Sequence, residues 1–329
     1  MCAIIEKIQK EVPIMSTNEN KGKKTEVTAL QAISAEDRKD WISLAFVQAG
    51  ICVCVPAFLL GALLAEAMPI WPAIISGSLG YLIVVIGMVA TGMIGCDLGL
   101  ASCTCCQAGF GKSGARFIVS TIFAVNMIGW FGIQNGVCGE AFSNAMLAMT
   151  GWDIPVVVSN TIWGIIMLLT AVYGVHALEK LDKISIPLLM IIMCYGTFLA
   201  FKVYGTGNLN DEGTVQSMSF MSGVALSFNF TAVGTITGPD YTRFQKSRKD
   251  TVKSVFYGVF PMGVITLIMG IVLTKLSGQY DISMVLIEVG LPLLGIIALV
   301  ISTWTTNSTN AYSAGLNIVM ALKLKDNRR

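Results

Sequence analysis

The chain has 329 residues, of which 54% are hydrophobic and only 13% are charged. A soluble protein would carry about a quarter charged residues, so this composition disfavours a soluble enzyme or binding domain. The formal net charge of +2 and the scattering of the basic residues exclude an obvious nucleic-acid-binding surface. We therefore predict an all-α polytopic membrane protein whose solvent is the lipid bilayer and which has no nucleic-acid partner.

Eight apolar segments are long enough to cross a bilayer core of roughly 30 Å, which requires about 20 helical residues. In chain order we predict these spans at about 42–65, 71–95, 115–148, 155–176, 184–204, 218–238, 252–275 and 291–320. The apolar stretch 281–290 is too short to cross. It predicts a helix that lies on the surface or dips into it as a lid.

The distribution of lysine and arginine supports the count of eight spans. If the N-terminus is cytoplasmic, all but two of the 22 Lys and Arg residues lie in cytoplasmic segments, the two exceptions being Lys202 and Lys275. We therefore predict a multi-pass protein of the cell (inner) membrane with both termini in the cytoplasm. Residues 1–40 and 323–329 would be cytoplasmic tails, and 41–322 the transmembrane domain.

Two of the predicted spans are interrupted by glycine and proline. The first, LAFVQAGICVCVPAFLLGALL, contains Gly50 and Pro56, and the sixth, SFNFTAVGTITGPDYTRF, contains Gly234 and Pro239. Proline removes a helix hydrogen bond, and in lipid the freed carbonyls must find partners or line a cavity. A kink without function is the alternative for either span alone. Because these spans are five apart and cross in opposite directions, the pair predicts a transporter binding site.

The eighth span carries a polar run, STWTTNSTN, in the middle of the crossing. Uncharged polar groups at that depth need partners. We predict a binding site there, with packing between helices as the alternative. Helical spacing places on one stripe, or beside it, Ser302, Thr306, Thr309, Ser313, Asn307 and Asn310.

The third span places an aromatic and two amide side chains on one face. Asn126, Trp130 and Gln134 follow each other at intervals of four residues. An indole beside an amide suits a flat polar ring, because the indole stacks and the amide offers both a donor and an acceptor.

Three other motifs are set aside. GFGKSG at 109–114 is similar to a phosphate-binding loop, but Cys106 occupies the position of its first glycine and no strand precedes it. Cys103, Cys105 and Cys106 match no common zinc spacing. His176 is the single histidine, with no cysteine or carboxylate constellation around it. We therefore predict no catalytic residues and no enzyme.

The motifs WFGIQ in the third span, AVGTITGPDYTRF in the sixth and TWTTNSTNAYSAGL in the eighth resemble the nucleobase–cation symporter-1 (purine/cytosine permease) family. The resemblance implies a leucine-transporter-like fold of two inverted five-helix repeats plus two further helices. The first repeat would be about 41–205, and the second, at about 216–322, would be incomplete. Because the family has about twelve spans, the chain is expected to be truncated after eight transmembrane helices.

The resemblance also implies a cation site between the first and eighth spans. It would use carbonyls at the break near Gly50 and Val53, the Ser302 carbonyl, and the hydroxyls of Thr305 and Thr306. Sodium is a hard cation that prefers several oxygen ligands. The two threonines favour sodium over a proton as the coupling ion, because no carboxylate is expected at this place.

The same resemblance implies a substrate ring that stacks between Trp130 and Phe230, with amides reading its edge and exposed peptide groups near Gly234. Glu140 is the only charged residue well inside the predicted spans, which favours a neutral ring. The predicted substrate-binding residues are Trp130, Gln134, Phe230, Gly234, Asn307 and Asn310.

These expectations together predict a secondary active transporter that imports a nucleobase, with cytosine as the first choice, by sodium-coupled symport with alternating access. Alternatives are a purine, a hydroxymethylpyrimidine or a hydantoin-like substrate, and coupling to protons. An alternative of another class is a truncated membrane fragment that does not transport. Beyond the coupling ion we expect no cofactor, and no obligate protein partner is evident.

Overall fold

The computed structural model describes residues 30–210, 217–279 and 282–324, and every element within these ranges is a helix. Most of the predicted N-terminal tail, 1–29, and the end of the second tail, 325–329, lie outside the described residues. Short helices connect the long ones: η1 (Ala35–Asp37), α5 (Ser102–Cys105), α6 (Gln107–Gly114), the π-helix η2 (Ala115–Val119), η3 (Gly207–Asn210) and α13 (Ile282–Glu288).

Each of the eight predicted spans has a counterpart in the structure. Two of them are pairs of helices: α2 (Trp41–Cys52) with α3 (Val55–Ala67), and α10 (Phe220–Thr231) with α11 (Val233–Thr242). The other six are single helices: α4 (Ile70–Leu98), α7 (Ser120–Thr150), α8 (Val156–Val172), α9 (Val175–Tyr204), α12 (Arg248–Ser277) and α14 (Pro292–Leu322). The prediction of an all-α protein is confirmed for the described residues.

Length and composition alone give a smaller number of membrane crossings. Among the described residues, 5 helices are long and apolar enough to span a bilayer, or up to 6 if the bent pair α2 and α3 is one span. α8 is shorter, with 17 residues, and α14 carries its polar run at mid-length. The count of eight crossings therefore stays a prediction, although each segment is helical.

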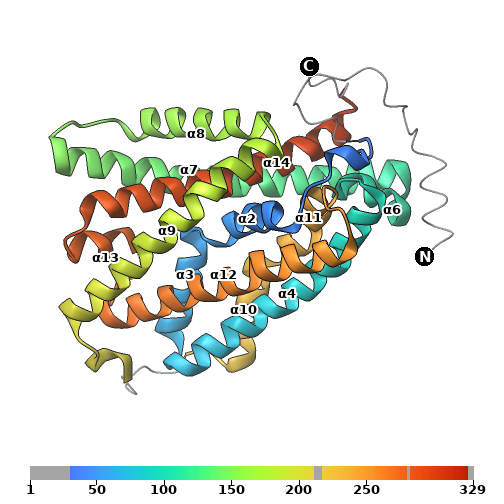
Figure 1. Cartoon of the computed structure of the whole chain (residues 1–329). Coiled ribbons are helices and arrows are strands. Elements are labelled where there is room, and N and C mark those ends of the chain that lie inside the picture. The colour runs from blue at the N-terminus through green and yellow to red at the C-terminus, as the bar shows by residue number, and fades with distance from the viewer. Residues whose placement is uncertain (1–29, 211–216, 280–281, 325–329) are drawn as a thin grey trace.

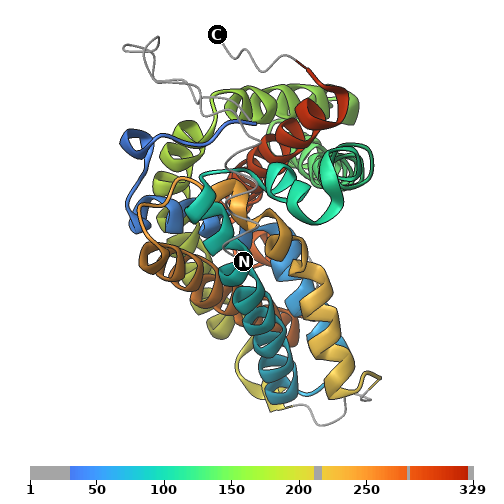
Figure 2. The ribbon, with the colours of Figure 1, turned by 90° about the vertical axis from the view of Figure 1, so that its right-hand side faces the viewer.

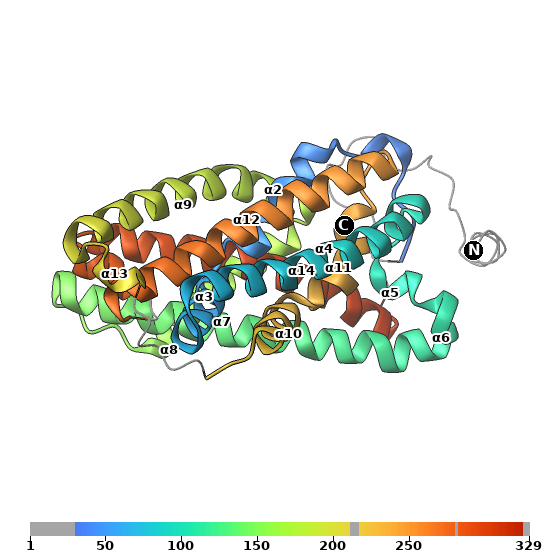
Figure 3. The ribbon, with the colours of Figure 1, turned by 90° about the horizontal axis from the view of Figure 1, so that it is seen from below.

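The long helices pack as two groups with α9 between them (Figures 1, 2 and 3). The first group contains α2, α3, α4, α10, α11 and α12, and the second contains α7, α8 and α14. α9 contacts α2 and α12 of the first group as well as α8 and α14 of the second. As a result, α2 and α14 meet where the two groups face each other.

Small residues bring the backbones of the first group into direct contact. A Cβ atom at Gly61 of α3 would lie 2.5 Å from the Leu267 carbonyl oxygen of α12. In the reverse direction, a Cβ at Gly270 of α12 would lie 2.5 Å from the Phe58 carbonyl oxygen of α3. Close approach of this kind is typical of membrane helices, whose association depends on packing between small residues. It holds α3 firmly on α12 just beyond the break.

The helix predicted to lie on or dip into the surface is present as α13, and it packs against neighbouring helices. Val285 and Leu286 are fully buried, and Leu286 lies over Gly196 of α9. At the end of α9, the Tyr204 hydroxyl donates a 2.7 Å hydrogen bond to the Glu288 carboxylate. α13 therefore covers this end of the bundle against α9 and α14. The described chain begins and ends at the opposite end (Figure 1).

Candidate functional site

The first span breaks between α2 and α3, as its glycine and proline predict. The two helices are bent by 52°. Val53 leaves the helical conformation with φ −88° and ψ 73°, and Pro56 lies in the first turn of α3. Proline is tolerated there because the first amides of a helix have no partner inside it. The break exposes the last carbonyls of α2 to α14.

Oxygen atoms from both sides of the break come together. The Thr306 Oγ1 lies 2.9 Å from the Gly50 carbonyl oxygen of α2 and 3.0 Å from the Ser302 carbonyl oxygen of its own helix. Thr305 donates its hydroxyl to the Ser302 carbonyl at 2.9 Å. These residues and Val53 are all buried. Of the five predicted cation ligands, the structure directly joins Gly50, Ser302 and Thr306.

This cluster fits a small hard cation. Two carbonyls and a hydroxyl offer lone pairs at hydrogen-bonding distance of one another, in a place closed to water. An unwound membrane helix supplying carbonyl oxygens is a usual solution for binding Na⁺ or H⁺ in transporters. The Thr306 hydroxyl has one proton for the two carbonyl oxygens that it contacts.

The two predicted stacking residues contact each other directly. The rings of Trp130 on α7 and Phe230 on α10 have centroids 5.8 Å apart and an interplanar angle of 65°, an edge-to-face contact. A flat ring can enter between them only if they move apart. One turn along α7, Gln134 is buried and its Oε1 has no hydrogen-bond partner among the described residues. That atom is ready to accept a hydrogen bond from a ligand.

The remaining predicted substrate residues divide in role. The Asn307 side-chain amide donates a 3.0 Å hydrogen bond to the Phe131 carbonyl, so it joins α14 to α7 beside Trp130. Asn310 is half-buried and donates to the Asn307 side-chain oxygen at 3.3 Å. Gly234 is half-buried just after the interruption between α10 and α11, where an added Cβ would meet its nearest atom at 3.7 Å. Gly234 is therefore the most open of the three.

Part of the polar run on α14 holds helices together. Ser308 donates its hydroxyl to the Met167 carbonyl of α8 at 3.3 Å. The Trp304 indole donates to the Thr170 hydroxyl of α8 at 2.9 Å. The interpretation as interhelical packing is therefore correct for this face of α14, while Ser302 and Thr306 face α2.

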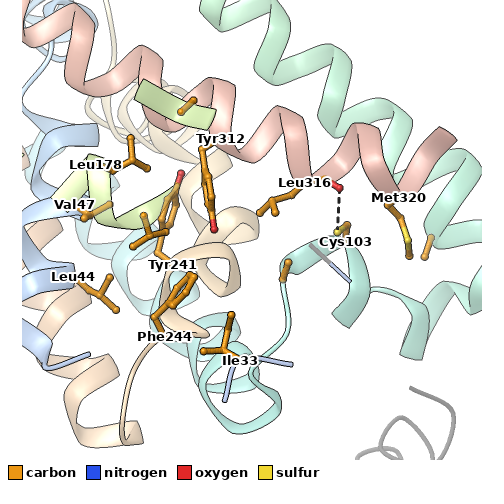
Figure 4. Packing of buried hydrophobic residues seen from close by; sticks show 14 residues of the cluster. Ile33, Leu44, Val47, Cys103, Leu178, Tyr241, Phe244, Tyr312, Leu316 and Met320 are labelled. Atoms are coloured by element: carbon orange, nitrogen blue, oxygen red, sulfur yellow. Dashed lines mark hydrogen bonds between the residues drawn. The ribbon is translucent and has the colours of Figure 1, made fainter. Parts of the chain in front are cut away.

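Buried hydrophobic side chains, among them the aromatic Tyr241, Phe244 and Tyr312, pack together in one cluster (Figure 4). The ring centroids of Tyr241 on α11 and Tyr312 on α14 lie 6.2 Å apart, and the Tyr241 hydroxyl shares a 3.1 Å hydrogen bond with the Ser313 hydroxyl. The Arg243 guanidinium, which is fully buried, donates to the Tyr312 hydroxyl at 2.7 Å. Underneath, burial raises the pKa of the Cys103 thiol to about 12.

Two features of the site escaped the sequence-based prediction. Asn126 is exposed, so it does not accompany Trp130 and Gln134 toward the interior. Glu140, expected as the lone charge within the spans, is exposed on α7, whereas Asp182 of α9 is fully buried beside Gly50. The expectation that no carboxylate lies at the cation site is therefore wrong, and the threonines alone no longer favour sodium over a proton. The signal for Asp182 was the buried face of α9, on which Leu178, Asp182 and Leu189 follow at helical spacing.

Long apolar helices, one of them broken opposite a polar partner, define a helical membrane protein of the transporter type. The chain belongs to the family described as permeases for cytosine/purines, uracil, thiamine and allantoin, whose model matches residues 33–325. This family comprises permeases, so the prediction of a protein that is not an enzyme is confirmed.

Curated relatives include cytosine permease of Escherichia coli strain K12, which is 29% identical over 85% of this chain and 65% of the relative. The purine-uracil permease NCS1 of Arabidopsis thaliana is 25% identical over 87% of this chain and 52% of the relative. Allantoin permease of Bacillus subtilis is 23% identical over 87% and 65% respectively. The chain thus spans about two thirds or less of the length of these relatives.

Solved structures share the fold. Mhp1, a nucleobase-cation-symport-1 family transporter, in a closed conformation with bromovinylhydantoin bound, superposes with a TM-score of 0.82 at 18% identity, covering 90% of this chain and 69% of that one. An inward-facing structure of Mhp1 gives a TM-score of 0.68 at 18% identity, covering 95% and 74%.

Proposed function

We propose that this chain acts as a secondary active transporter that imports a nucleobase, with cytosine as the first choice, together with sodium. It would lie in the cell (inner) membrane with both termini in the cytoplasm. The membership of a permease family supports transport as the activity. The relative named cytosine permease supports cytosine as the first substrate to test.

One observation carries the sodium coupling. The Thr306 hydroxyl connects the Gly50 carbonyl, at the break in α2, to the Ser302 carbonyl on α14. The first of these helices belongs to one packing group and the second to the other. A cation bound by these oxygens would draw the two groups together, so its binding would favour one arrangement of the groups over another. Thr305, which donates to the same Ser302 carbonyl, and Val53, at the break, would complete the site.

The proposed substrate site lies between α7 and α10. Trp130 and Phe230 would separate to take a flat ring between them, and the free Oε1 of Gln134 would accept a hydrogen bond from its edge. Asn307 and Asn310 would extend this hydrogen bonding, and the peptide groups near Gly234 would complete the contact. A purine, a hydroxymethylpyrimidine or a hydantoin-like ring would satisfy the same groups, as the breadth of the family description illustrates.

Uptake of radiolabelled cytosine by cells that express the chain tests the proposal. External sodium is replaced by choline, and unlabelled purines, allantoin and hydantoins are added as competitors. We expect sodium-dependent uptake that Thr306→Ala removes. Thr161→Ala is the matched control, because that exposed threonine on α8 donates only to its own helix, to the Val157 carbonyl.

Each alternative gives a different result in this assay. Uptake that follows a proton gradient and ignores sodium contradicts sodium coupling. Competition by another ring in place of cytosine changes the substrate. If the protein is present in the membrane and no ring is taken up, the interpretation as a non-transporting fragment is correct.

A further inference from the structure

The strongest unexplained feature of the interior is the carboxylate of Asp182. This residue lies in the second turn of α9 and is 0% exposed. Neither of its oxygens has a hydrogen-bond partner among the described residues. An ionised carboxylate buried without a partner is costly, so buried charges in proteins are paired or bind metal ions.

The Asp182 carboxylate faces Gly50, in the last turn of α2 before the break. A Cβ atom at Gly50 would lie 2.6 Å from its Oδ1 and 3.2 Å from its Oδ2, so the carboxylate occupies the space that a side chain at residue 50 would need. Gly50 is the residue whose carbonyl accepts the Thr306 hydroxyl. The carboxylate therefore packs against a residue whose carbonyl belongs to the candidate cation site.

Two basic residues of this region, Lys183 on α9 and Lys39 just before α2, are both paired with Glu179. Lys183 donates to the Glu179 carboxylate at 2.7 Å, and Lys39 forms an ion pair with the other oxygen of Glu179. On the neighbouring α11, the Tyr241 phenol is within electrostatic range of Asp182, but its hydroxyl is bonded to Ser313. Within the described part of the chain, no side chain is hydrogen-bonded to this carboxylate.

We propose that Asp182 supplies the negative charge of the cation site, as a carboxylate ligand from a third helix, α9. This inference rests on the proposed function and identifies how its coupling ion is held. The carbonyls of Gly50 and Ser302 and the hydroxyl of Thr306 provide neutral oxygens, and Asp182 balances the charge of a monovalent cation. Hard cations prefer such oxygen ligands, and a single carboxylate matches a single positive charge.

The packing explains why glycine stands at residue 50. Any side chain there would push the carboxylate away from the break, because it would overlap with Oδ1. The arrangement also places the ion at the meeting point of α2, α9 and α14, which belong to the two helix groups and to the helix between them. The bound cation would thus tie all three parts of the molecule.

The test is sodium binding to the purified full chain without any substrate. Binding of ²²Na⁺ is measured by scintillation proximity, and the melting temperature is recorded in sodium-free and sodium-containing buffer. Asp182→Asn keeps the shape of the side chain and removes the charge. Glu140→Gln is the matched control, because it removes an exposed carboxylate that lies outside the site.

We expect Asp182→Asn to weaken sodium binding at least tenfold and to remove most of the sodium-induced rise in melting temperature. In sodium-free buffer the variant should melt no lower than the unmodified chain, because an unpaired buried charge has been removed. A residue with a purely structural role would instead lower the sodium-free melting temperature. Glu140→Gln should bind sodium as the unmodified chain does.

A double-mutant cycle keeps the test decisive if Asp182→Asn folds poorly. Gly50→Ala should weaken sodium binding by displacing the carboxylate, and Asp182→Ala should leave space for the added methyl group. Because both changes act on one contact, their effects on sodium affinity should not add. Additive effects would contradict the proposed contact.

The inference and the proposed function fail in different ways. If Asp182→Asn keeps sodium affinity within twofold while Thr306→Ala loses it, the sodium site exists and Asp182 is not a ligand. If the unmodified chain binds no sodium at all, both the sodium coupling and the role of Asp182 are wrong.

Discussion

The two faces of α14 use the same kinds of polar residue for different purposes. Toward α7 and α8, Asn307 and Ser308 give their protons to main-chain carbonyls, so each donor is paired and the helices are joined. Toward α2, Thr306 meets two carbonyls with one proton, and an unpartnered carboxylate lies next to them. On the face toward α7 and α8, each hydrogen-bond donor named here has an acceptor. On the face toward α2, the oxygen acceptors outnumber the hydrogen-bond donors.

This difference separates structural polar residues from a binding site in a membrane helix. Composition cannot make the distinction, because both faces are drawn from one run of Ser, Thr and Asn. A surplus of oxygen acceptors indicates a place for a cation, because buried acceptors without donors are costly. The following substitutions test the comparison one face at a time, from the largest expected effect to the smallest.

Thr306→Ala should have the largest effect. It removes a ligand oxygen and the only hydroxyl seen to join α14 to the Gly50 carbonyl in the described structure. Hydrogen bonds to charged groups contribute about 1.5–3 kcal/mol, so sodium affinity should fall by roughly ten- to a hundredfold. Titration of the sodium-induced melting shift measures this change, and Thr306→Ser should restore most of it. An unchanged sodium affinity in Thr306→Ala would remove this residue from the site.

Trp130→Ala should weaken binding of the substrate ring by about 1–3 kcal/mol, the usual contribution of stacking between a base and an aromatic side chain. Binding of radiolabelled cytosine to the purified chain measures the loss. Trp130→Phe should retain part of the affinity, because it still presents an aromatic face to Phe230. Retained affinity in Trp130→Ala would show that the ring binds elsewhere.

Asn307→Leu should lower stability and weaken ring binding while leaving sodium affinity unchanged, because it removes both the donor for the Phe131 carbonyl and an amide proposed to contact the ring. The expected loss is about 1 kcal/mol in the free energy of unfolding, the typical net value of a hydrogen bond. Thermal unfolding in detergent measures it, and sodium affinity should stay the same. A large loss of sodium affinity without a change in melting temperature would mean that the two faces are not separate.

Ser308→Ala should give the smallest effect. Its hydroxyl makes a long bond of 3.3 Å to the Met167 carbonyl. Interhelical hydrogen bonds in membrane proteins average about 0.6 kcal/mol, so the melting temperature should change little. Sodium and ring binding should match those of the unmodified chain. If Ser308→Ala reduced sodium affinity as strongly as Thr306→Ala, the acceptor surplus would not mark the site.

The features that the sequence predicted are local ones. Apolar blocks set the positions of the long helices, and Gly50 and Pro56 set the break in the first span. The stripe that includes Thr306 and Ser313 also follows from helical spacing alone, and it does face α2 and α11.

Features that depend on how helices dock were not predictable. The fifth span was expected to begin at residue 184, because Lys180 and Lys183 were assigned to a loop, yet α9 begins at Val175. Lys183 reaches Glu179 one turn away, which leaves Asp182 on the buried face of the same helix. The contact between Trp130 and Phe230 likewise depends on the distance between the two helix groups, which no single segment encodes.

The single proton of the Thr306 hydroxyl has a consequence for how long the two helix groups stay together. One neutral hydrogen bond contributes about 1 kcal/mol, which changes the ratio of two conformations only about fivefold. Moving a population from 1:99 to 99:1 requires about 5.5 kcal/mol. Before the ion arrives, the Gly50–Thr306 contact alone would therefore let α2 and α14 part and rejoin frequently. With respect to this contact, the joined and separated arrangements of α2 and α14 would both be populated, and a cation bound as proposed would shift the balance toward the joined one.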